Sequence, residues 1–429
     1  MTDKNVLIIV YYWPPAGGPG VQRWLKFTKY LPDFGFKPIV YCPENPNYPI
    51  GDKSLLDEIP SEVTILKQPI KEPYRFAKFL SKNSAKTISS GVIPDKKKQS
   101  FVERLMLFIR GNFFIPDARK NWIKPSVSFL SKYINKHNID TIITTGPPHS
   151  LHLIGLQLKQ KLNVNWVADF RDPWTTIGYH KALKLLPFAK KKHLQLENDV
   201  LNAADEIIVT SYNTKNEFIS KTHKPTTVIT NGYDSKSEVS IQKDSKFSIS
   251  HIGSLLSDRN PQILWECLSE LVQENEDFKT NFQLNLVGVV SDSIVESIKM
   301  HNLESHLNLV GYVSHKKAIH FQKKSQLLLL IEINSEDTKA IIPGKLFEYM
   351  ISETPILAIG PKDSDVEQMI SSTNTGSYFY YNQKLELKKQ LLDSFEKFKK
   401  ENLKTNPIGL EQYSRKALTK KLSELLKDL

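Results

Sequence analysis

The sequence predicts an α/β protein of two Rossmann-like domains, each with a doubly wound parallel sheet, that face each other across a cleft. Three observations support this fold class. The chain has 429 residues, which is enough for two hydrophobic cores. In each half, short apolar runs alternate with longer amphipathic segments, as in strands linked by crossover helices. Between the halves, residues 235–246 are polar and lack hydrophobic periodicity, so we expect a linker there.

The first predicted domain spans residues 1–234 and begins with an apolar strand at residues 6–12. A glycine-containing loop follows, and then an amphipathic helix at residues 21–31. Further strands and helices are expected at residues 38–41, 141–144, 150–161, 166–169, 206–210 and 228–229. Parallel sheets place ligands in the loops at the carboxyl ends of their strands. The loops that follow these strands are therefore the candidate binding segments.

The second predicted domain spans residues 247–405 and repeats the same alternation, starting with a strand at residues 247–252. The expected strands and helices that follow are residues 261–274, 283–287, 292–301, 307–310, 316–323, 327–331, 345–352 and 355–359. A last helix lies near residues 411–426. We expect the C-terminal segment, residues 406–429, to pack back on the first domain.

Cysteine usage and hydropathy restrict the class of protein. The two cysteines, Cys42 and Cys267, are far apart and have no metal-type spacing, which argues against a disulfide scaffold or a zinc ribbon. The apolar runs are much shorter than the roughly 20 residues of a membrane-spanning helix. The first residues lack the basic segment that precedes the apolar core of a signal peptide. We therefore expect a cytoplasmic protein.

The net charge of +12 is concentrated in residues 71–137, which contain fifteen lysines and arginines and four acids. Large apolar residues are interspersed with these cations. Coulomb attraction and shallow insertion add together at an anionic membrane, so we expect residues 71–137 to bind the inner face of a membrane. A solvated, lysine-rich insertion is an equally strong alternative. Nucleic acid is not an expected partner, because no helix-turn-helix or RNA-binding signature accompanies the charge.

The loop after the first strand contains Gly17 and Gly18 and leads into a helix that carries Arg23. Glycine lets a main chain approach a ligand, and a helix start offers free N–H donors to an anion. The loop does not match GxGxxG, so a dinucleotide cofactor is not expected. A plain tight turn is the alternative interpretation.

Two further loops of the first domain carry polar side chains. One contains His149, and the other contains Asp169, Arg171, Asp172 and Trp174. Carboxylates around an arginine are costly to bury unless they are paired or face a ligand. A sugar or acceptor site would use the carboxylates to accept hydroxyl protons and the indole as a stacking face. A salt-bridged loop and a structural histidine are the alternatives.

In the second domain, Gly253 ends a strand and Arg259 precedes a helix, which suits a diphosphate. Later, Lys345 and Glu348 lie at the start of another helix. Glu348 could accept two hydrogen bonds from a ribose diol, while Lys345 faces the phosphates. The alternative for Glu348 is that it only complements the helix dipole.

Together these segments resemble a retaining glycosyltransferase of the GT-B fold, most similar to glycosyltransferase family four. The resemblance covers residues 14–23, 169–174, 231–234, 253 with 259, 311–313 and 343–357. It implies that the second domain holds a nucleotide sugar, most commonly UDP-linked, and that the first holds the acceptor. It also implies transfer without a metal or another cofactor, in the synthesis of a lipid-linked glycan or polysaccharide of the cell envelope.

The resemblance also assigns roles to residues. Glu348 would hold the ribose, and Arg259 and Lys345 the diphosphate. Gly17, Gly18 and Gly253 would lie beside the phosphates or the transferred sugar. We assign acceptor binding to Arg23, Arg171 and Trp174, and orientation of the acceptor at the reacting centre to His149, Asp169 and Asp172.

Two positions depart from the family pattern. Ser254 stands where an arginine often follows the glycine, and Ala340 where a second glutamate is common. Glu332 and Glu336 are near the second position but out of register. The donor sugar therefore cannot be inferred from this motif. A nucleotide-sugar epimerase or hydrolase of the same fold, or a non-catalytic sugar-binding scaffold, are the alternative functions.

Overall fold

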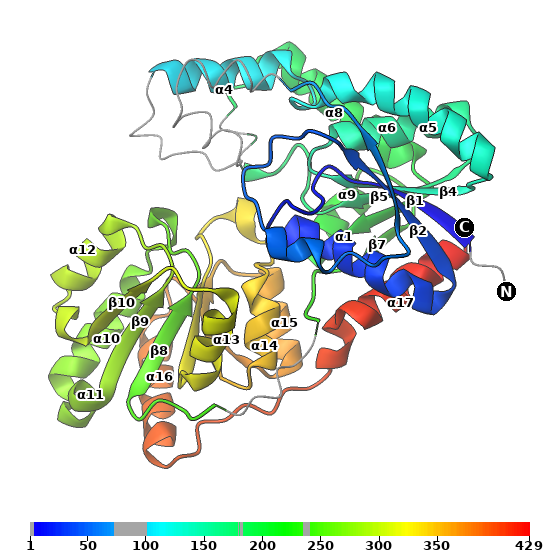
Figure 1. Ribbon diagram of the computed structural model, residues 1–429. Helices are drawn as coiled ribbons and strands as arrows, with labels where there is room; N and C mark the ends of the chain where they lie inside the picture. The colour runs from blue at the N-terminus through cyan, green and yellow to red at the C-terminus, as the bar shows by residue number, and fades with distance from the viewer. Residues whose placement is uncertain (1–3, 73–100, 179, 181–182, 235–240) are drawn as a thin grey trace. The chain divides into compact units, whose positions relative to one another are not determined.

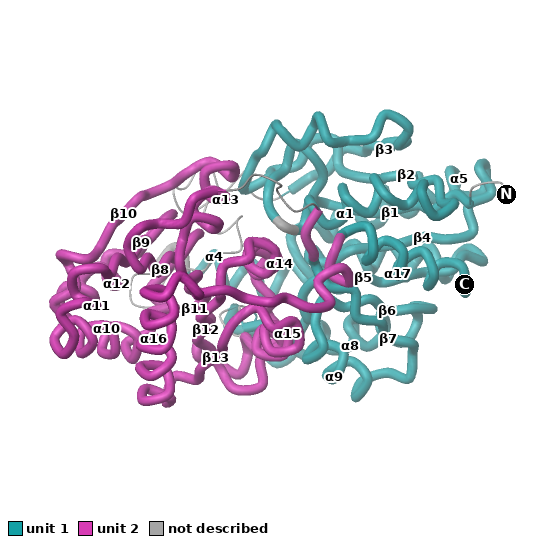
Figure 2. Tube along the Cα trace, turned by 90° about the horizontal axis from the view of Figure 1, so that it is seen from below, with its two compact units in different colours: residues 1–231, 415–429 teal, residues 232–414 magenta. Residues whose placement is uncertain are grey.

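The computed structural model describes residues 4–72, 101–178, 180, 183–234 and 241–429. The chain divides into two compact units (Figure 2). Unit 1 consists of residues 1–231 and 415–429, and unit 2 of residues 232–414. Each unit contains one parallel sheet, and the two sheets have seven and six strands. The predicted fold class, two doubly wound parallel-sheet domains, is confirmed.

The sheet of unit 1 has the strand order β3-β2-β1-β4-β5-β6-β7. All neighbouring strands are parallel, with Val6 of β1 aligned with Pro38 of β2 and Thr141 of β4. The strands are β1 (Lys4–Ile9), β2 (Phe36–Pro43), β3 (Thr64–Gln68), β4 (Thr141–Gly146), β5 (Asn165–Phe170), β6 (Glu206–Val209) and β7 (Thr226–Val228).

Helices cover both faces of this sheet. Successive residues of a strand point to opposite faces, and in this sheet the residues on each face are apolar. Leu7 and Ile9 of β1 pack with one set of helices, α5, α6, α8 and α9, while Val6 and Ile8 pack with α1 and α17. The helices are α1 (Pro19–Tyr30), α4 (Phe101–Phe113), α5 (Ile123–His137), α6 (Ser150–Lys161), α8 (Pro187–Ala203), α9 (Tyr212–Ile219) and α17 (Arg415–Lys427). Figure 1 shows the C-terminal helix α17 alongside α1, where Lys416 pairs with Asp33 at 2.8 Å.

The sheet of unit 2 has the order β10-β9-β8-β11-β12-β13, again all parallel. Its strands are β8 (Phe247–Ile252), β9 (Phe282–Val287), β10 (Leu307–Gly311), β11 (Leu327–Ile331), β12 (Ile356–Gly360) and β13 (Gly376–Tyr380). One face packs with α10 (Gln262–Glu274), α11 (Glu276–Asn281), α12 (Asp292–Met300) and α16 (Lys384–Lys399). The other packs with α13 (His315–Lys324), α14 (Lys345–Ile351) and α15 (Asp365–Thr373).

Each sheet has one point where the strand order reverses, between β1 and β4 in unit 1 and between β8 and β11 in unit 2. The crossovers from the two central strands go to opposite sides at such a point, so the loops above it diverge and leave a crevice for a ligand. The loops after β1, β4, β8 and β11 are therefore the positions at which this fold exposes functional groups.

Several elements differ from the sequence prediction. Strands β3 and β13 were not predicted, because edge strands alternate polar and half-buried residues and give a weak apolar signal. The basic segment 71–137 is described in part: residues 73–100 lie outside the described residues, and the remainder contains α4 and α5. None of the helices among the described residues combines the length and the apolar character needed to cross a membrane.

Candidate functional site

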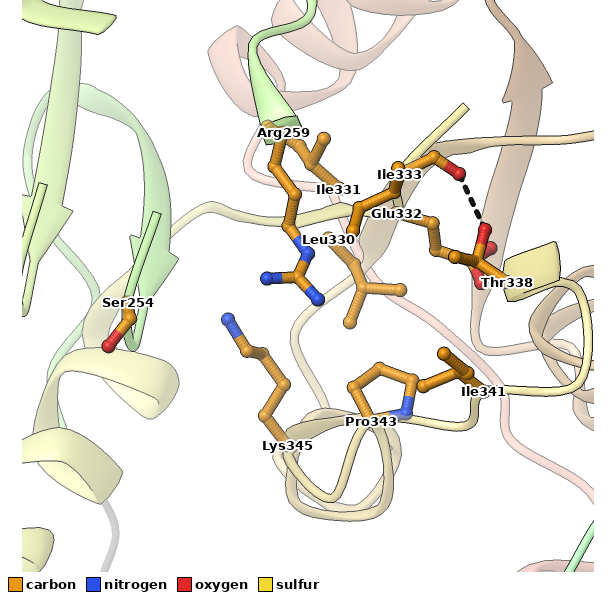
Figure 3. A pocket seen from close by; sticks show the side chains of 10 residues that line it. All are labelled: Ser254, Arg259, Leu330, Ile331, Glu332, Ile333, Thr338, Ile341, Pro343 and Lys345. Carbon is orange, nitrogen blue, oxygen red and sulfur yellow. Dashed lines mark hydrogen bonds between the residues drawn. The ribbon is translucent and has the colours of Figure 1, made fainter. Parts of the chain in front are cut away.

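A pocket of about 210 Å³ lies in unit 2 where the strand order reverses (Figure 3). It is formed by the loop after β8, the short 3-10 helix Ser257–Arg259, the end of β11, the following loop and the start of α14. Ten residues line the pocket. The polar or charged ones are Ser254, Arg259, Glu332, Thr338 and Lys345, and the apolar ones are Leu330, Ile331, Ile333, Ile341 and Pro343. The pocket thus combines charged groups with an apolar wall, as small-molecule sites do.

Two of the predicted donor residues, Arg259 and Lys345, meet in this pocket. Figure 3 shows their guanidinium and ammonium groups extending into it from two different elements. Burial and the charge of Arg259 lower the pKa of Lys345 to about 7, although the carboxylate of Glu348 opposes this. Two cations this close repel each other. An anion between them would relieve the repulsion and offset the cost of their desolvation.

The side chain of Lys345 is held by a buried histidine, His251 of β8. His251 is 1% exposed, and its Nδ1 lies 3.0 Å from the carbonyl oxygen of Leu329. A carbonyl can only accept, and Nδ1 makes the shorter of the two carbonyl contacts of the ring, so we place the proton on Nδ1. Nε2 lies 3.0 Å from the Lys345 ammonium, from which it accepts, and 3.4 Å from the carbonyl oxygen of Ser254. Burial, with the adjacent Lys345 charge, holds the pKa of His251 well below its usual range. The imidazole is therefore a neutral acceptor.

Gly253 is required by the same contact. Its φ of +114° lies in a region that side chains disfavour, and a Cβ there would be 2.9 Å from the Lys345 Nζ. The glycine therefore allows the ammonium to lie against the main chain after β8. Ser254, the first departure from the family pattern, also lines the pocket.

Glu332 is a pocket residue that the sequence analysis did not select. It follows β11 directly and is 5% exposed. Its carboxylate accepts hydrogen bonds from Tyr378 Oη at 2.7 Å and Ser364 Oγ at 2.9 Å. Burial raises the pKa of Glu332 to about 7, against the effect of these hydrogen bonds. The sequence contains a pattern that could have identified Glu332, namely an acidic residue immediately after a fully apolar strand.

Glu348 lies on α14 outside the lining of this pocket. Its carboxylate accepts hydrogen bonds from His315 Nε2 at 3.0 Å and Gln322 Nε2 at 2.8 Å, both on α13. The hydrogen bond to Glu348 raises the pKa of His315. The Glu348 side chain is 36% exposed, so it presents a partly exposed, oriented carboxylate next to α13. Ala340, the second departure from the family pattern, does not line the pocket.

In unit 1, Gly17 and Gly18 lie in the loop between β1 and α1, as predicted from the sequence. Gly18 has a φ of +101° and precedes the first turn of α1, and no side chain caps that turn. A Cβ on Gly17 would be 3.1 Å from Ile50 and 3.2 Å from Asp52. The loop therefore needs both glycines for its own conformation.

Arg23 and Asp169 were expected to face an acceptor, but they form a buried ion pair with each other. Arg23 Nη2 lies 2.8 Å from Asp169 Oδ1, and their side chains are 1% and 0% exposed. Asp169 also accepts from Trp24 Nε1 at 2.9 Å and Thr145 Oγ1 at 2.8 Å. Burial would raise the pKa of Asp169, but the charge and hydrogen bonds of Arg23 outweigh it and lower the pKa. The expectation of a ligand-facing pair is corrected: the two side chains are covered by protein.

Arg171 and Asp172 follow β5 and are half-buried. The Arg171 guanidinium donates to the carbonyl oxygens of Gly146 and Pro147 and lies 5.7 Å from the Tyr12 ring centroid. Burial raises the pKa of Asp172, and the charge of Arg171 partly opposes this. Three side chains were predicted to orient the acceptor: His149, Asp169 and Asp172. Of these, Asp172 is the one that is partly exposed.

Trp174 was expected to offer a stacking face, and this expectation is wrong. It is 1% exposed, its ring is stacked on His149 at 4.6 Å with an interplanar angle of 4°, and its Nε1 lies 3.2 Å from His193 Nδ1. Protein therefore occupies the face that a sugar would need.

His149 is 4% exposed, and neither of its ring nitrogens has a hydrogen-bond partner among the described residues. Burial, together with the nearby His152, holds its pKa well below the usual range. His149 is accordingly a neutral imidazole packed between aromatic neighbours. This environment matches the structural alternative for the histidine.

Comparisons with known proteins find one matching family model and several solved structures of similar fold. Residues 92–237 match the family model for Glycosyltransferase Family 4. A glycosyltransferase from Rickettsia africae ESF-5 is 14% identical with a TM-score of 0.62, over 100% of this chain and 99% of that chain. Anabaena Alr3699/HepE in complex with UDP is 14% identical with a TM-score of 0.62, over 99% and 100%. The lipopolysaccharide outer core galactosyltransferase WaaB is 14% identical with a TM-score of 0.59, over 99% and 100%.

A comparison with curated proteins finds no match. The family match and the full-length structural similarity confirm the GT-B fold, the resemblance to glycosyltransferase family 4 and the predicted enzyme class, a glycosyltransferase. The family match covers residues of unit 1 and ends at the start of unit 2. The pocket of unit 2 lies outside the matched residues.

Proposed function

We propose that this glycosyltransferase is a retaining enzyme that transfers a sugar from a UDP-sugar to a lipid-linked or polysaccharide acceptor in cell-envelope glycan synthesis. The observation that carries the proposal is the pair of cations, Arg259 and Lys345, in the pocket of unit 2. In the described part of the chain, the only hydrogen-bond partner of the Lys345 ammonium is the neutral His251. The pocket therefore has positive charge available for a diphosphate.

The proposed reaction breaks the bond between the anomeric carbon and the β-phosphate oxygen and forms one from that carbon to an acceptor hydroxyl oxygen. The leaving phosphate takes the hydroxyl proton on the same face of the sugar. Negative charge grows on the phosphate, and Arg259 and Lys345 would stabilise it. Asp172 would orient the acceptor, because its carboxylate is the partly exposed one after β5. The mechanism assigns no step to a metal or another cofactor.

Two features support a uridine nucleotide and a ribose contact. A protein of the same fold is known in complex with UDP. Glu348 presents an oriented, 36% exposed carboxylate on α14, which can accept hydrogen bonds from both hydroxyls of a ribose. His315, which donates to the same carboxylate, would have to share it with the ribose.

The acceptor class is supported by an exposed surface of unit 1, which we call the α4–α8 face. Leu105, Ile109 and Phe113 follow one side of α4 at four-residue spacing and are 47%, 39% and 58% exposed. The start of α8 adds Leu186 and Phe188, which are also exposed. Figure 1 shows α4 close to α8. These five residues give unit 1 an apolar strip of the kind that inserts into the interface of a bilayer.

A side-chain contact joins the two parts of this face. Asn112 of α4 accepts a hydrogen bond from Leu186 N at 2.7 Å and donates to the Lys184 carbonyl at 3.4 Å. Residues 104–114 and 184–194 contain no acid. Their cations are Arg104, Arg110, Lys184, Lys190, Lys191 and Lys192. Like charges disfavour pairing of this face with a second copy, whereas anionic lipid is complementary to it. We therefore propose peripheral binding to the cytoplasmic face of an anionic membrane.

Nucleotide-sugar binding and turnover test the proposed reaction. A thermal-shift panel of UDP- and GDP-sugars should raise the melting temperature with at least one donor. With a membrane extract as acceptor, that donor's sugar should be transferred with retention of anomeric configuration. The variants R259A and E348A should lose transfer, and K362A, an exposed lysine of unit 2, is the control. Wild-type rates in both variants would contradict the site.

Two other outcomes would favour the alternative functions. Consumption of the donor without an acceptor would indicate an epimerase or hydrolase, and binding of the donor without turnover would indicate a non-catalytic scaffold.

Flotation with liposomes tests the membrane proposal. Binding should require anionic lipid and weaken as salt rises, because exposed charges are screened. The double variant I109S/F113S should weaken binding at least about tenfold, since burying each large apolar side chain is worth about 1.5–3 kcal/mol. L385S, at an 81% exposed leucine of α16, is the matched control. Equal binding of the wild type to neutral and anionic vesicles, or to none, would contradict the proposal.

A further inference from the structure

Lys345 needs a partner that holds it without cancelling its charge. Its side chain crosses from α14 to the main chain after β8, and there its ammonium meets the imidazole of His251 at 3.0 Å. A carboxylate at this distance would also hold the ammonium, but it would form an ion pair and compete with any incoming anion. The structure has a neutral ring nitrogen at this position instead.

His251 is fixed in the state that this contact requires. Its ring is fully enclosed in the core, and the Leu329 carbonyl oxygen, 3.0 Å from Nδ1, fixes the proton on that nitrogen. The Nε2 lone pair then accepts from the Lys345 ammonium at 3.0 Å, and the Ser254 carbonyl oxygen lies farther from the same nitrogen, at 3.4 Å. Tyr349 fixes the backbone of the next residue, since its Oη accepts from Ile252 N at 2.9 Å. The neutral tautomer is thus set by the main chain of β11, and the backbone next to the imidazole is held by Tyr349.

We propose that His251 is a positioning residue of the donor site, whose neutral imidazole aims the Lys345 ammonium into the pocket and leaves its positive charge available to the donor's diphosphate. The inference rests on the proposed function, in which this pocket takes a nucleoside diphosphate. It goes further by assigning a role to a side chain that does not line the pocket. The charged groups that face Lys345 are Arg259 from the short helix Ser257–Arg259 and Glu348 on its own helix.

Two nearly isosteric substitutions separate this role from a structural one. H251Q places a neutral amide oxygen near the position of Nε2, whereas H251E places a carboxylate there. H251Q should bind UDP within a few-fold of the wild type. H251E should bind UDP at least about tenfold more weakly, because the carboxylate neutralises Lys345. A third variant, H251N, is too short to reach Lys345 and should lose about tenfold, the value of a hydrogen bond to a charged group.

Titration calorimetry with UDP and with uridine provides the readout. Uridine has no phosphate, so its affinity should be unchanged in all three variants, whereas a purely structural defect would weaken both ligands. K345M should weaken UDP binding, and adding H251N to it should have no further effect. Thermal melts check that each variant folds, and the comparison of H251Q with H251E provides the conclusion if H251N does not fold.

The outcomes distinguish the inference from the function on which it rests. If the wild type binds no nucleoside diphosphate, the proposed function fails. If the wild type binds UDP and K345M weakens it, but H251Q and H251E bind equally, the function stands and the role of His251 is refuted. Equal losses for UDP and uridine would also refute it.

Discussion

The affinity for UDP should depend on pH through Lys345. Burial and Arg259 lower the pKa of this ammonium to about 7 in the free protein. A diphosphate beside it favours the charged form and should raise that pKa by about 1–3 units. Well below pH 7 the ammonium is charged in both states, so Lys345 contributes no pH dependence to the affinity there. Above pH 7 binding must take up a proton, and affinity should fall about tenfold per pH unit until the bound-state pKa is reached.

Titration calorimetry between pH 7.5 and 9 measures this slope, in a range where a phosphate of pKa about 6 is already ionised. Repeating the titration at pH 8 in two buffers of different ionisation enthalpy should show uptake of about 0.4 to 0.9 of a proton, for a bound-state pKa about 1–3 units above the free-state value. K345M should bind more weakly at pH 7 and show no slope. A wild-type affinity that is flat across this range, or a slope that persists in K345M, would refute the reasoning.

Three further predictions concern stability and backbone geometry. D169N should lower the free energy of unfolding in urea by about 3–5 kcal/mol, because it leaves the 1% exposed Arg23 without its charge partner. For Glu332, whose folded-state pKa is raised to about 7, stability is greatest below the unfolded-state pKa and is lost as pH rises to 7. Between pH 5 and pH 8 the wild type should therefore lose about 3 kcal/mol more than E332Q in pH-dependent denaturation. G253A should weaken UDP binding, because its Cβ would be 2.9 Å from the Lys345 Nζ, whereas G35A has a similar positive φ of +84° and nothing within 4 Å and should affect stability alone.

The sequence was sufficient for the central strands and for the loops that follow them, but not for the edge strands β3 and β13. Central parallel strands such as β1 and β11 are continuous apolar runs, so their ends are easy to locate, and the ligand rule for parallel sheets then selects the following loops. Arg259 and Lys345 were found in this way. Glu332 meets the same criterion, but it was set aside because it did not match the register of a family motif.

The sequence was not sufficient for the direction of individual side chains. Trp174 and His149 are 25 positions apart, and Arg23 and Asp169 are 146 positions apart. Neither contact leaves a periodic signal, because both depend on how helices pack over the sheet. An indole that could stack on a sugar can equally stack on an imidazole, and packing decides between the two.

The two points where the strand order reverses differ in charge balance, and this difference supports the proposal that the donor binds in unit 2. In unit 1 the cations are satisfied internally: Arg23 is paired with Asp169, and Arg171 donates to main-chain carbonyl oxygens beside Asp172. In unit 2 the Lys345 ammonium is held by the neutral His251 next to Arg259. A diphosphate at the second point would supply negative charge to two cations that have no carboxylate among their hydrogen-bond partners in the described part of the chain, whereas Arg23 at the first already has one. In the proposed function, the presence of a histidine rather than a carboxylate at this position of β8 is what keeps the charge of Lys345 available to the donor.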